Sequence, residues 1–384
     1  MKESNIGKLL ITAIKNNKIK QNSKQIIQEM QIFLKNIKNT NKSIASNYKY
    51  FPQYFNDMKH MSSECILFTK KEITISQYQL QELLTAYNFC DMLYGVTNPT
   101  NKDKRQINPL KMSLIEDNQF QKFIISNLQP FNVHQLIKHN FHQSDFYSPV
   151  FICFTMLNKI YIIIRGTFSL KDVFADMFAT IEEINGYNLH KGFGLSALFL
   201  YNNLINIVKN QDVVIIGHSY GAAIAAILSI FIKNDVKSLS TIGFGCPPCL
   251  PINLIDQLSM TTVLYENDPV PFMSVRCLEG LDKRLCSVAQ KQKFTKQERE
   301  TKPEDMLIPG TIYHAFKISG EIQWFQTRTQ EYSELILKGI IKNWKNHLDY
   351  FDVLRVVAQE GSKLLDCQSE IDDEDSIIQN ILEL

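Results

Sequence analysis

The feature that most restricts the fold of this chain is a β-branched run that ends in a glycine-flanked turn and continues as an alanine-rich helix. The run is Val213 to Ile216, the turn is Gly217-His-Ser219-Tyr-Gly221, and the apolar helix extends over 222–232. A strand, a G-x-S-x-G turn and a helix in this order are typical of a nucleophile elbow. The turn forces strained backbone angles on Ser219 and places it at a helix N-terminus, which favours negative charge. The pattern therefore predicts Ser219 as a nucleophile.

Dense apolar runs alternate with helical segments over most of the chain. Runs at 150–156 and 160–164 flank a three-residue turn, as in a pair of strands joined by a tight turn. Further strands are predicted at 240–244, 261–265, 311–318 and 322–326, and helices at 77–94, 193–208 and 332–344. Buried β-branched runs between helices indicate an α/β fold, with a mostly parallel central sheet and helices on both faces.

Composition excludes some classes of protein and divides the chain into three parts. With 45% hydrophobic residues the chain is not disordered as a whole, and a net charge of +2 argues against a dedicated nucleic-acid binder. The first fifty residues hold ten Lys against two Glu, whereas 359–384 hold eight acids against one Lys. We therefore predict a basic helical extension at 1–60, a globular domain at 61–358 and an acidic tail at 359–384. The apolar pattern lapses at 279–305, which predicts an exposed, mobile charged insertion.

Cysteines and hydropathy bear on the compartment. Eight cysteines in 384 residues do not make a disulfide scaffold. Cys246-Pro-Pro-Cys249 has the spacing of a redox motif or half a zinc site, but without a second ligand pair we interpret it as two structural thiols. No run approaches the roughly 18–20 apolar residues of a membrane span, and the N-terminus lacks a secretory signal pattern. These observations favour a cytoplasmic protein.

A serine nucleophile needs a histidine base and an orienting carboxylate, which in this type of fold follow it in the order acid, then histidine. Asp268 comes directly after the predicted strand 261–265, in a loop where a carboxylate can project from the sheet edge. Glu266 and Asp256 are the rival acids. Glu266 lies closer to the strand itself and Asp256 falls in a predicted helix, so Asp268 is preferred.

The remaining parts of such a site are the base and the donors for an oxyanion. Downstream of Ser219 the sequence has two histidines, His314 and His347. Backbone donors are expected from Tyr220, which follows the nucleophile, and from Thr167, which follows an earlier strand and also carries a hydroxyl. His218, inside the turn, is interpreted as a packing residue with local hydrogen bonds.

Several motifs in the same order resemble those of the class 3 lipases, and within them the sn-1-specific diacylglycerol lipases. The motifs are Arg165-Gly-Thr-Phe-Ser-Leu-Lys-Asp172, His190-Lys-Gly-Phe193, Gly217-His-Ser-Tyr-Gly221, Cys246-Pro-Pro248, Asn267-Asp-Pro-Val-Pro271, Pro309-Gly-Thr-Ile-Tyr-His314 and Asn346-His-Leu-Asp-Tyr-Phe351. The resemblance covers about residues 76–358. It implies an α/β-hydrolase fold, assigns the base to His347 and leaves His314 as a strand residue.

The resemblance also implies an activity. A Ser219, Asp268 and His347 triad would hydrolyse carboxylic esters of diacylglycerol or monoacylglycerol, with no metal or organic cofactor. Two alternatives stay open: another serine hydrolase (phospholipase A1, thioesterase or acyltransferase), or a catalytically dead lipase-like binding protein. The sequence departs from the family at Tyr220, where Leu or Met is common, and it lacks the multi-span region of the larger diacylglycerol lipases.

The partner expected from this resemblance is a lipid substrate at a membrane or droplet surface. The +8 segment at 1–50 has amphipathic spacing suited to peripheral contact with an anionic membrane, at about 1 kcal/mol per well-placed Lys. The alternative is that its helices pack over the catalytic domain and leave their lysines in solvent.

Overall fold

The computed structural model describes residues 71–95, 117–142, 147–166, 181–290 and 301–329, and five single residues at 332, 346, 347, 350 and 354. Four of the predictions fall outside these residues: the extension 1–60, the acidic tail, Thr167 and nearly all of the helix expected at 332–344.

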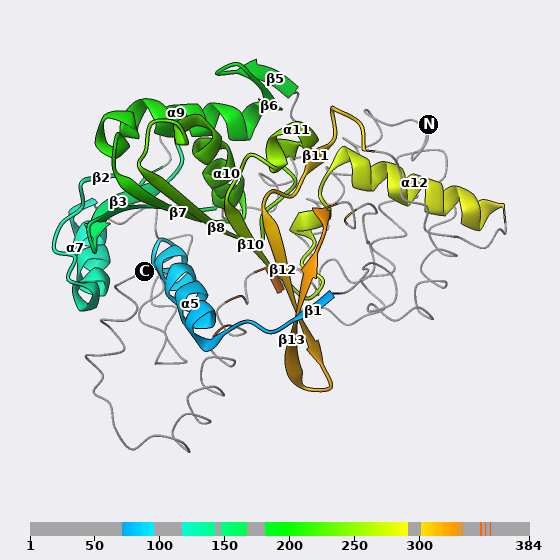
Figure 1. Cartoon of the computed structure of the whole chain (residues 1–384), viewed down its shortest axis with the longest axis horizontal. Helices are drawn as coiled ribbons and strands as arrows, with labels where there is room; N and C mark the ends of the chain where they lie inside the picture. The colour runs from blue at the N-terminus through cyan, green and yellow to red at the C-terminus, as the bar shows by residue number, and fades with distance from the viewer. Residues whose placement is uncertain are drawn as a thin grey trace.

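A nine-stranded sheet forms the centre of the fold, in the order β1-β13-β12-β10-β8-β7-β4-β3-β2 (Figure 1). The strands are β1 (Lys71–Ile73), β2 (Lys138–Asn140), β3 (Phe151–Met156), β4 (Lys159–Ile164), β7 (Asp212–His218), β8 (Ser238–Phe244), β10 (Met260–Tyr265), β12 (Thr311–Ile318) and β13 (Glu321–Thr327). The five strands from β12 to β4 are parallel, and two antiparallel strands extend each edge. Parallel strands in the middle bring their carboxyl ends to one edge of the sheet, where β7 and β10 deliver the predicted site residues.

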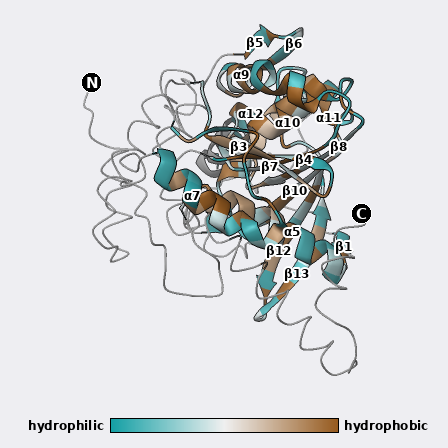
Figure 2. Cartoon of the chain, turned by 90° about the vertical axis from the view of Figure 1, so that its left-hand side faces the viewer, coloured by the Kyte–Doolittle hydropathy of each residue, from teal (hydrophilic) through white to brown (hydrophobic). Residues whose placement is uncertain are grey.

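Helices cover both faces of this sheet. On one face, α10 (Tyr220–Ile232) contacts β7, β8 and the outer helix α9 (Lys191–Val208). Every residue of α10 is buried, and Figure 2 shows apolar residues along it. On the other face, α5 (Gln77–Met92) contacts β4, β7 and β8, and α7 (Asp117–Leu128) joins the same core. The predicted α/β fold with helices on both faces is thus confirmed.

Alternating side chains of the strands feed the two cores. On β4, Ile162 and Ile164 belong to the core under α9 and α10, whereas Ile163 belongs to the core under α5. This alternation follows from the two-residue period of a strand, and it explains why the central strands read as continuous apolar runs. The tight turn predicted between β3 and β4 is present, with Leu157 and Asn158 both at positive φ.

Several smaller elements accompany the sheet and its helices. They are the hairpin of β5 (Ile181–Ile184) with β6 (Tyr187–His190), the pair of β9 (Leu250–Pro251) with β11 (Met306–Leu307), the short helix α11 (Ile252–Ile255), and the 3₁₀ helices at Gln129–Phe131 and Val270–Phe272.

The segment 279–305, predicted as an exposed, mobile charged insertion, begins in a helix and ends at a buried residue. Residues 279–289 belong to α12 (Val275–Ala289), and Asp305 is buried in an ion pair with Arg276 of the same helix, at 3.4 Å. The composition misled because Glu, Lys and Arg are good helix formers. A helix that packs along one side needs few apolar residues, so its charged side reads as a solvated loop.

No helix within the described ranges is long and apolar enough to span a bilayer.

Candidate active site

Ser219 occupies a strained turn between the end of β7 and the start of α10. Its φ of 57° and ψ of −124° lie where L-residues are rare, at a cost of about 1–3 kcal/mol. The surroundings hold it there: its N–H donates to the carbonyl of Phe244 at the end of β8, at 2.8 Å. The residue is 2% exposed, and its Oγ has no hydrogen-bond partner among the described residues. A buried hydroxyl left without a partner in a strained turn is a candidate reactive group.

Asp268 and His347 form a buried pair, although 79 residues separate them. His347 Nδ1 lies 2.8 Å from Asp268 Oδ2, and both side chains are at most 2% exposed. The second carboxylate oxygen, Oδ1, accepts the N–H of Val270 at 2.9 Å. Asp268 lies in the loop after β10, as expected from its position behind the strand.

The rival acids and the rival base lie in other surroundings. Glu266, at positive φ just after β10, accepts the N–H of Lys317 on its carboxylate at 2.7 Å. Asp256 ends the short helix α11. His314, the rival base, lies on β12 and donates from Nε2 to the carbonyl of Glu266 at 2.7 Å, with Tyr332 Oη at its Nδ1.

Tyr350 is a residue of this site that sequence reasoning did not single out. Its hydroxyl donates to Asp268 Oδ2 at 2.6 Å, the oxygen that also faces His347. Burial alone raises the pKa of Asp268, but His347 and the hydrogen bonds from His347, Tyr350 and the Val270 N–H outweigh it, so the net pKa is lowered. The signal was available: Tyr350 lies three residues after His347 in the motif Asn346-His-Leu-Asp-Tyr-Phe351, a spacing that places both on one face if the segment is helical.

Gly245 shows how closely this pair is packed. It has a φ of +56°, and a Cβ at this position would lie 2.8 Å from His347 Nδ1 and 2.9 Å from Asp268 Oδ2. Any side chain here must displace the histidine or the carboxylate, so the backbone after β8 forms a wall against which the pair is fixed.

Of the two predicted oxyanion donors, Tyr220 lies among the described residues and Thr167 does not. Tyr220 is the first residue of α10, so its N–H points out of the amino-terminal end of that helix. Thr167 lies outside the described residues, but its neighbour Gly166 approaches the turn closely. A Cβ on Gly166 would lie 2.9 Å from the Cβ of Ser219 and 2.7 Å from the carbonyl oxygen of His218. The loop after β4 therefore passes directly over the serine.

The prediction of local hydrogen bonds for His218 was wrong. Its Nδ1 lies 3.0 Å from Tyr94 Oη and its Nε2 lies 2.9 Å from the carbonyl oxygen of His347, residues 124 and 129 positions away. A strand residue inside a sheet has its own backbone paired along the ladder, so its side chain meets whatever the fold packs against it. Sequence spacing alone carries no signal for such partners.

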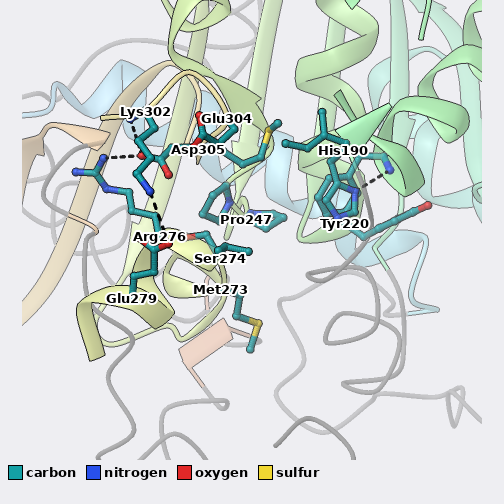
Figure 3. Close-up of a pocket in the computed structure, with 15 residues that line it drawn as sticks. His190, Tyr220, Pro247, Met273, Ser274, Arg276, Glu279, Lys302, Glu304 and Asp305 are labelled. Carbon is teal, nitrogen blue, oxygen red and sulfur yellow. Dashed lines mark hydrogen bonds and ion pairs between the residues drawn. The ribbon is translucent and has the colours of Figure 1, made fainter. Parts of the chain in front are cut away.

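A cavity of about 180 Å³ adjoins the turn. Figure 3 shows His190 and Tyr220 on one side of it, Arg276, Glu279 and Lys302 on the other, and Pro247 between them. Its apolar walls come mainly from Phe193, Tyr220, Pro247, Pro248, Met273 and Met306. Neither Ser219 nor His347 lines it, so the phenol of Tyr220 is the wall that the cavity shares with the serine turn.

The phenol of Tyr220 is fixed in place. Its hydroxyl lies 2.7 Å from Ser196 Oγ of α9, and its ring meets Phe193 edge to face at a centroid distance of 5.3 Å. Tyr220 replaces the Leu or Met common after the nucleophile, and its hydroxyl has a hydrogen-bond partner in Ser196.

Cys246 and Cys249 are both free and fully buried, and burial raises the pKa of the Cys246 thiol. Their thiols lie in the turn after β8, as expected for structural cysteines. The described residues contain no group of three or more His, Cys, Asp or Glu side chains placed to hold a metal ion.

Comparison with known families matches residues 161–277 to the lipases of class 3. Diacylglycerol lipase-beta of Mus musculus is 26% identical over 148 residues, which cover 34% of this chain and 22% of that protein. Diacylglycerol lipase-alpha of Homo sapiens is 29% identical over 175 residues, covering 40% of this chain and 16% of that protein. The chain thus matches about a fifth of the length of these curated relatives.

Solved structures with a similar arrangement include the Rhizomucor miehei lipase in its propeptide complex, with a TM-score of 0.47 and 18% identity over 74% of this chain and 81% of that one. A Yarrowia lipolytica lipase aligns with a TM-score of 0.46 at 17% identity, over 74% and 98% of the two chains. Because both TM-scores are below 0.5, the fold is assigned here from the order and direction of the strands in the central sheet.

Proposed function

From the match of residues 161–277 to the class 3 lipases, we propose that the chain is a carboxylic ester hydrolase of this family, acting on acylglycerols through Ser219, His347 and Asp268. Diacylglycerol or monoacylglycerol is the proposed substrate, because the relatives it matches are named diacylglycerol lipases. No metal or organic cofactor takes part in the proposed reaction.

One observation carries this proposal: a buried histidine–carboxylate pair, 2.8 Å between Nδ1 and Oδ2, whose histidine ring lies 4.7 Å from that of His218, the residue before a buried serine in a strained turn. A serine hydroxyl is a weak nucleophile at neutral pH, and a histidine held in one tautomer by a carboxylate is the usual means of activating it. Since Nδ1 faces the carboxylate, it carries the proton, and Nε2 is left as the basic atom.

In the proposed reaction Ser219 Oγ attacks the ester carbonyl while His347 Nε2 takes the hydroxyl proton. Asp268 stabilises the resulting imidazolium, and the N–H groups of Tyr220 and Thr167 stabilise the oxyanion. The imidazolium gives its proton to the leaving alcohol as the ester C–O bond breaks. Water, deprotonated by the same Nε2, then cleaves the acyl-serine, releases the fatty acid and restores the serine.

The cavity beside the turn supports a long apolar substituent on the substrate. Phe193, Tyr220, Pro247 and Met273 offer walls suited to an acyl chain, and the side near Arg276 offers charged groups suited to a polar head. A substrate with one apolar and one polar end matches this lining.

The decisive experiment replaces Ser219 by Ala and measures hydrolysis of a short-chain nitrophenyl ester together with labelling by a fluorophosphonate. We expect both to fall to background. Ser229→Ala is the matched control, because Ser229 is also buried and lies on α10 but is hydrogen-bonded to Thr241 and the Ala225 carbonyl. Parental hydrolysis by Ser219→Ala would overturn the proposal, and absence of labelling in the parent would favour a catalytically dead binding protein.

The substrate class is tested separately by a panel of diacylglycerol, monoacylglycerol, phospholipid and thioester. We expect acylglycerols to give the highest kcat/KM. Preference for a phospholipid or thioester would keep the triad and reassign the substrate.

Contact of the +8 segment with an anionic membrane surface is also a proposal. Deleting residues 1–50 is expected to weaken binding to anionic vesicles, and the loss should shrink as salt is raised because surface charges are screened. Equal binding of the two proteins at low salt would contradict it.

A further inference from the structure

His218 lies in a chain of hydrogen bonds whose direction the geometry settles. A carbonyl oxygen only accepts, so His218 Nε2, 2.9 Å from the carbonyl of His347, carries the proton. Burial, and then the neighbouring His347, lower the pKa of His218 to about 3, so the ring is neutral and its Nδ1 is an acceptor. Tyr94 Oη, 3.0 Å from Nδ1, is therefore the donor of that bond.

The oxygen of Tyr94 has a second partner in the loop after β4. It accepts the N–H of Gly166 at 2.9 Å, and a Cβ on Gly166 would come within 2.5 Å of this oxygen. The N–H of Gly166 thereby donates to Tyr94, which fixes the direction of the peptide between Arg165 and Gly166. The bonds thus run in one direction, from Gly166 through Tyr94 to His218, and from His218 to His347.

These hydrogen bonds connect three segments that the proposed reaction must keep aligned. Gly166 precedes the proposed oxyanion donor, His218 precedes the nucleophile, and His347 is the proposed base. His347 is held at two points, because Asp268 binds its ring and His218 binds its backbone. The rings of His218 and His347 also lie against each other, with centroids 4.7 Å apart.

We propose, on the basis of the function assigned above, that Tyr94 and His218 are positioning residues that align Gly166 after β4, the serine turn and the backbone of His347. Neither touches the substrate. Their contribution is geometric: a displacement of about 1 Å among these groups costs on the order of a hundredfold in rate.

The test is Tyr94→Phe in the full chain, which removes one oxygen and leaves the Gly166 N–H and His218 Nδ1 without it. We expect kcat per active site, counted by fluorophosphonate titration, to fall about 10- to 100-fold, with KM for a short-chain nitrophenyl ester within about twofold of the parent. A purely structural role predicts a lower Tm with kcat per titrated site unchanged, and that result would overturn the proposal.

The matched control is Tyr332→Phe. Tyr332 Oη lies 2.7 Å from Nδ1 of the buried His314, so the variant loses the same kind of tyrosine–histidine hydrogen bond, between residues that are not part of the His218 chain. We expect a similar fall in Tm and a kcat per titrated site within about twofold. Equal losses of kcat in the two variants would also overturn the proposal.

Two variants of His218 test its two hydrogen bonds separately, and they decide whether the residue has an aligning role if Tyr94→Phe does not fold. His218→Gln keeps a donor near the Nε2 position, and His218→Asn keeps an acceptor near the Nδ1 position. Each should retain more kcat per titrated site than His218→Ala, and equal kcat in all three would contradict an aligning role. If Ser219→Ala kept parental activity, the proposed function itself would fail, whereas normal kcat in Tyr94→Phe with an inactive Ser219→Ala would remove only the aligning role.

Discussion

Two buried histidines of this protein have hydrogen-bond partners of the same kind but lie in different surroundings. His218 and His314 each lie between a tyrosine hydroxyl at Nδ1 and a backbone carbonyl at Nε2, at 3.0 and 2.9 Å for the first and 2.7 and 2.7 Å for the second. His314 donates to the carbonyl of Glu266, two residues before the proposed acid. His218 donates to the carbonyl of His347, the proposed base.

The two histidines differ in how the backbone segment that accepts their hydrogen bond is otherwise fixed. The segment at Glu266 is fixed independently, since its N–H donates to the Ala315 carbonyl and its carboxylate accepts the Lys317 N–H. β10 and β12 are also paired in parallel up to Tyr265 and Ala315. The His218 hydrogen bonds instead span separations of 72, 124 and 129 residues. The strands β4 and β7 that lead to Gly166 and His218 are paired, but Tyr94 and His347 lie on neither strand. The same chemistry thus stabilises a sheet in one place and aligns separate segments in the other.

The largest expected effect tests which carboxylate serves the histidine. Asp268→Asn should lower kcat about 10³- to 10⁴-fold, because an amide cannot stabilise the imidazolium and favours the wrong tautomer. Glu266→Gln keeps an acceptor for the Lys317 N–H and should keep kcat within about twofold. Ester-hydrolysis kinetics of the two variants check this, and the reverse order of losses would move the acid to Glu266.

The next effect concerns Tyr350, whose hydroxyl binds the proposed acid directly. Tyr350→Phe removes a donor to ionised Asp268, so kcat should fall about tenfold, as for one hydrogen bond to a charged group. The lost donor also raises the pKa of Asp268, so NMR titration of this carboxyl should give a higher pKa than in the parent. Tyr332→Phe should leave the pKa of Asp268 unchanged, and an unchanged value in Tyr350→Phe would contradict the assignment.

A smaller effect follows from the pKa of His218. It is about 3 in the folded protein and about 6.5 in an unfolded chain, so below pH 6.5 the unfolded state binds the extra proton. The free energy of unfolding should therefore fall with decreasing pH, by up to about 1.4 kcal/mol per unit from this residue. In His218→Asn the slope of stability against pH between 6 and 4, from denaturant titrations, should be reduced. Parallel slopes would show that His218 is charged in the folded state.

The smallest expected effect is at Tyr220, whose hydroxyl pairs with Ser196 and with neither histidine chain. Tyr220→Phe should lower the free energy of unfolding by about 1 kcal/mol and leave kcat close to that of the parent, since the backbone N–H is retained. Tyr220→Leu should widen the cavity and shift the preference toward longer or bulkier acyl chains. A panel of nitrophenyl esters of increasing chain length checks this, and an unchanged preference would exclude the phenol as an acyl wall.

Most of the sheet and of the candidate site could be predicted because their signals are local. The central strands are continuous β-branched runs, and Ser219 is marked by a strand, a turn and a helix in fixed order. Asp268 could be placed because it follows a predicted strand. His347 depended on a motif resemblance, since nothing in its neighbourhood alone separates it from His314.

α12 was missed for a different reason. Its charged composition suggested an exposed, mobile insertion, and the burial of Arg276 with Asp305 comes from a contact 29 residues along the chain. A buried ion pair leaves no pattern in the sequence because its partners need no fixed spacing.

The sequence by itself predicted the nucleophile and the acid, because strand periodicity, helix signals and turn glycines act over a few residues, and a motif resemblance added the base. Only the tertiary structure decided that Tyr350 and His347 meet one oxygen of Asp268, and that Tyr94 and His218 connect three distant segments. The physical reason is that a buried polar group must find a partner, and packing between segments far apart in the chain determines which one it finds.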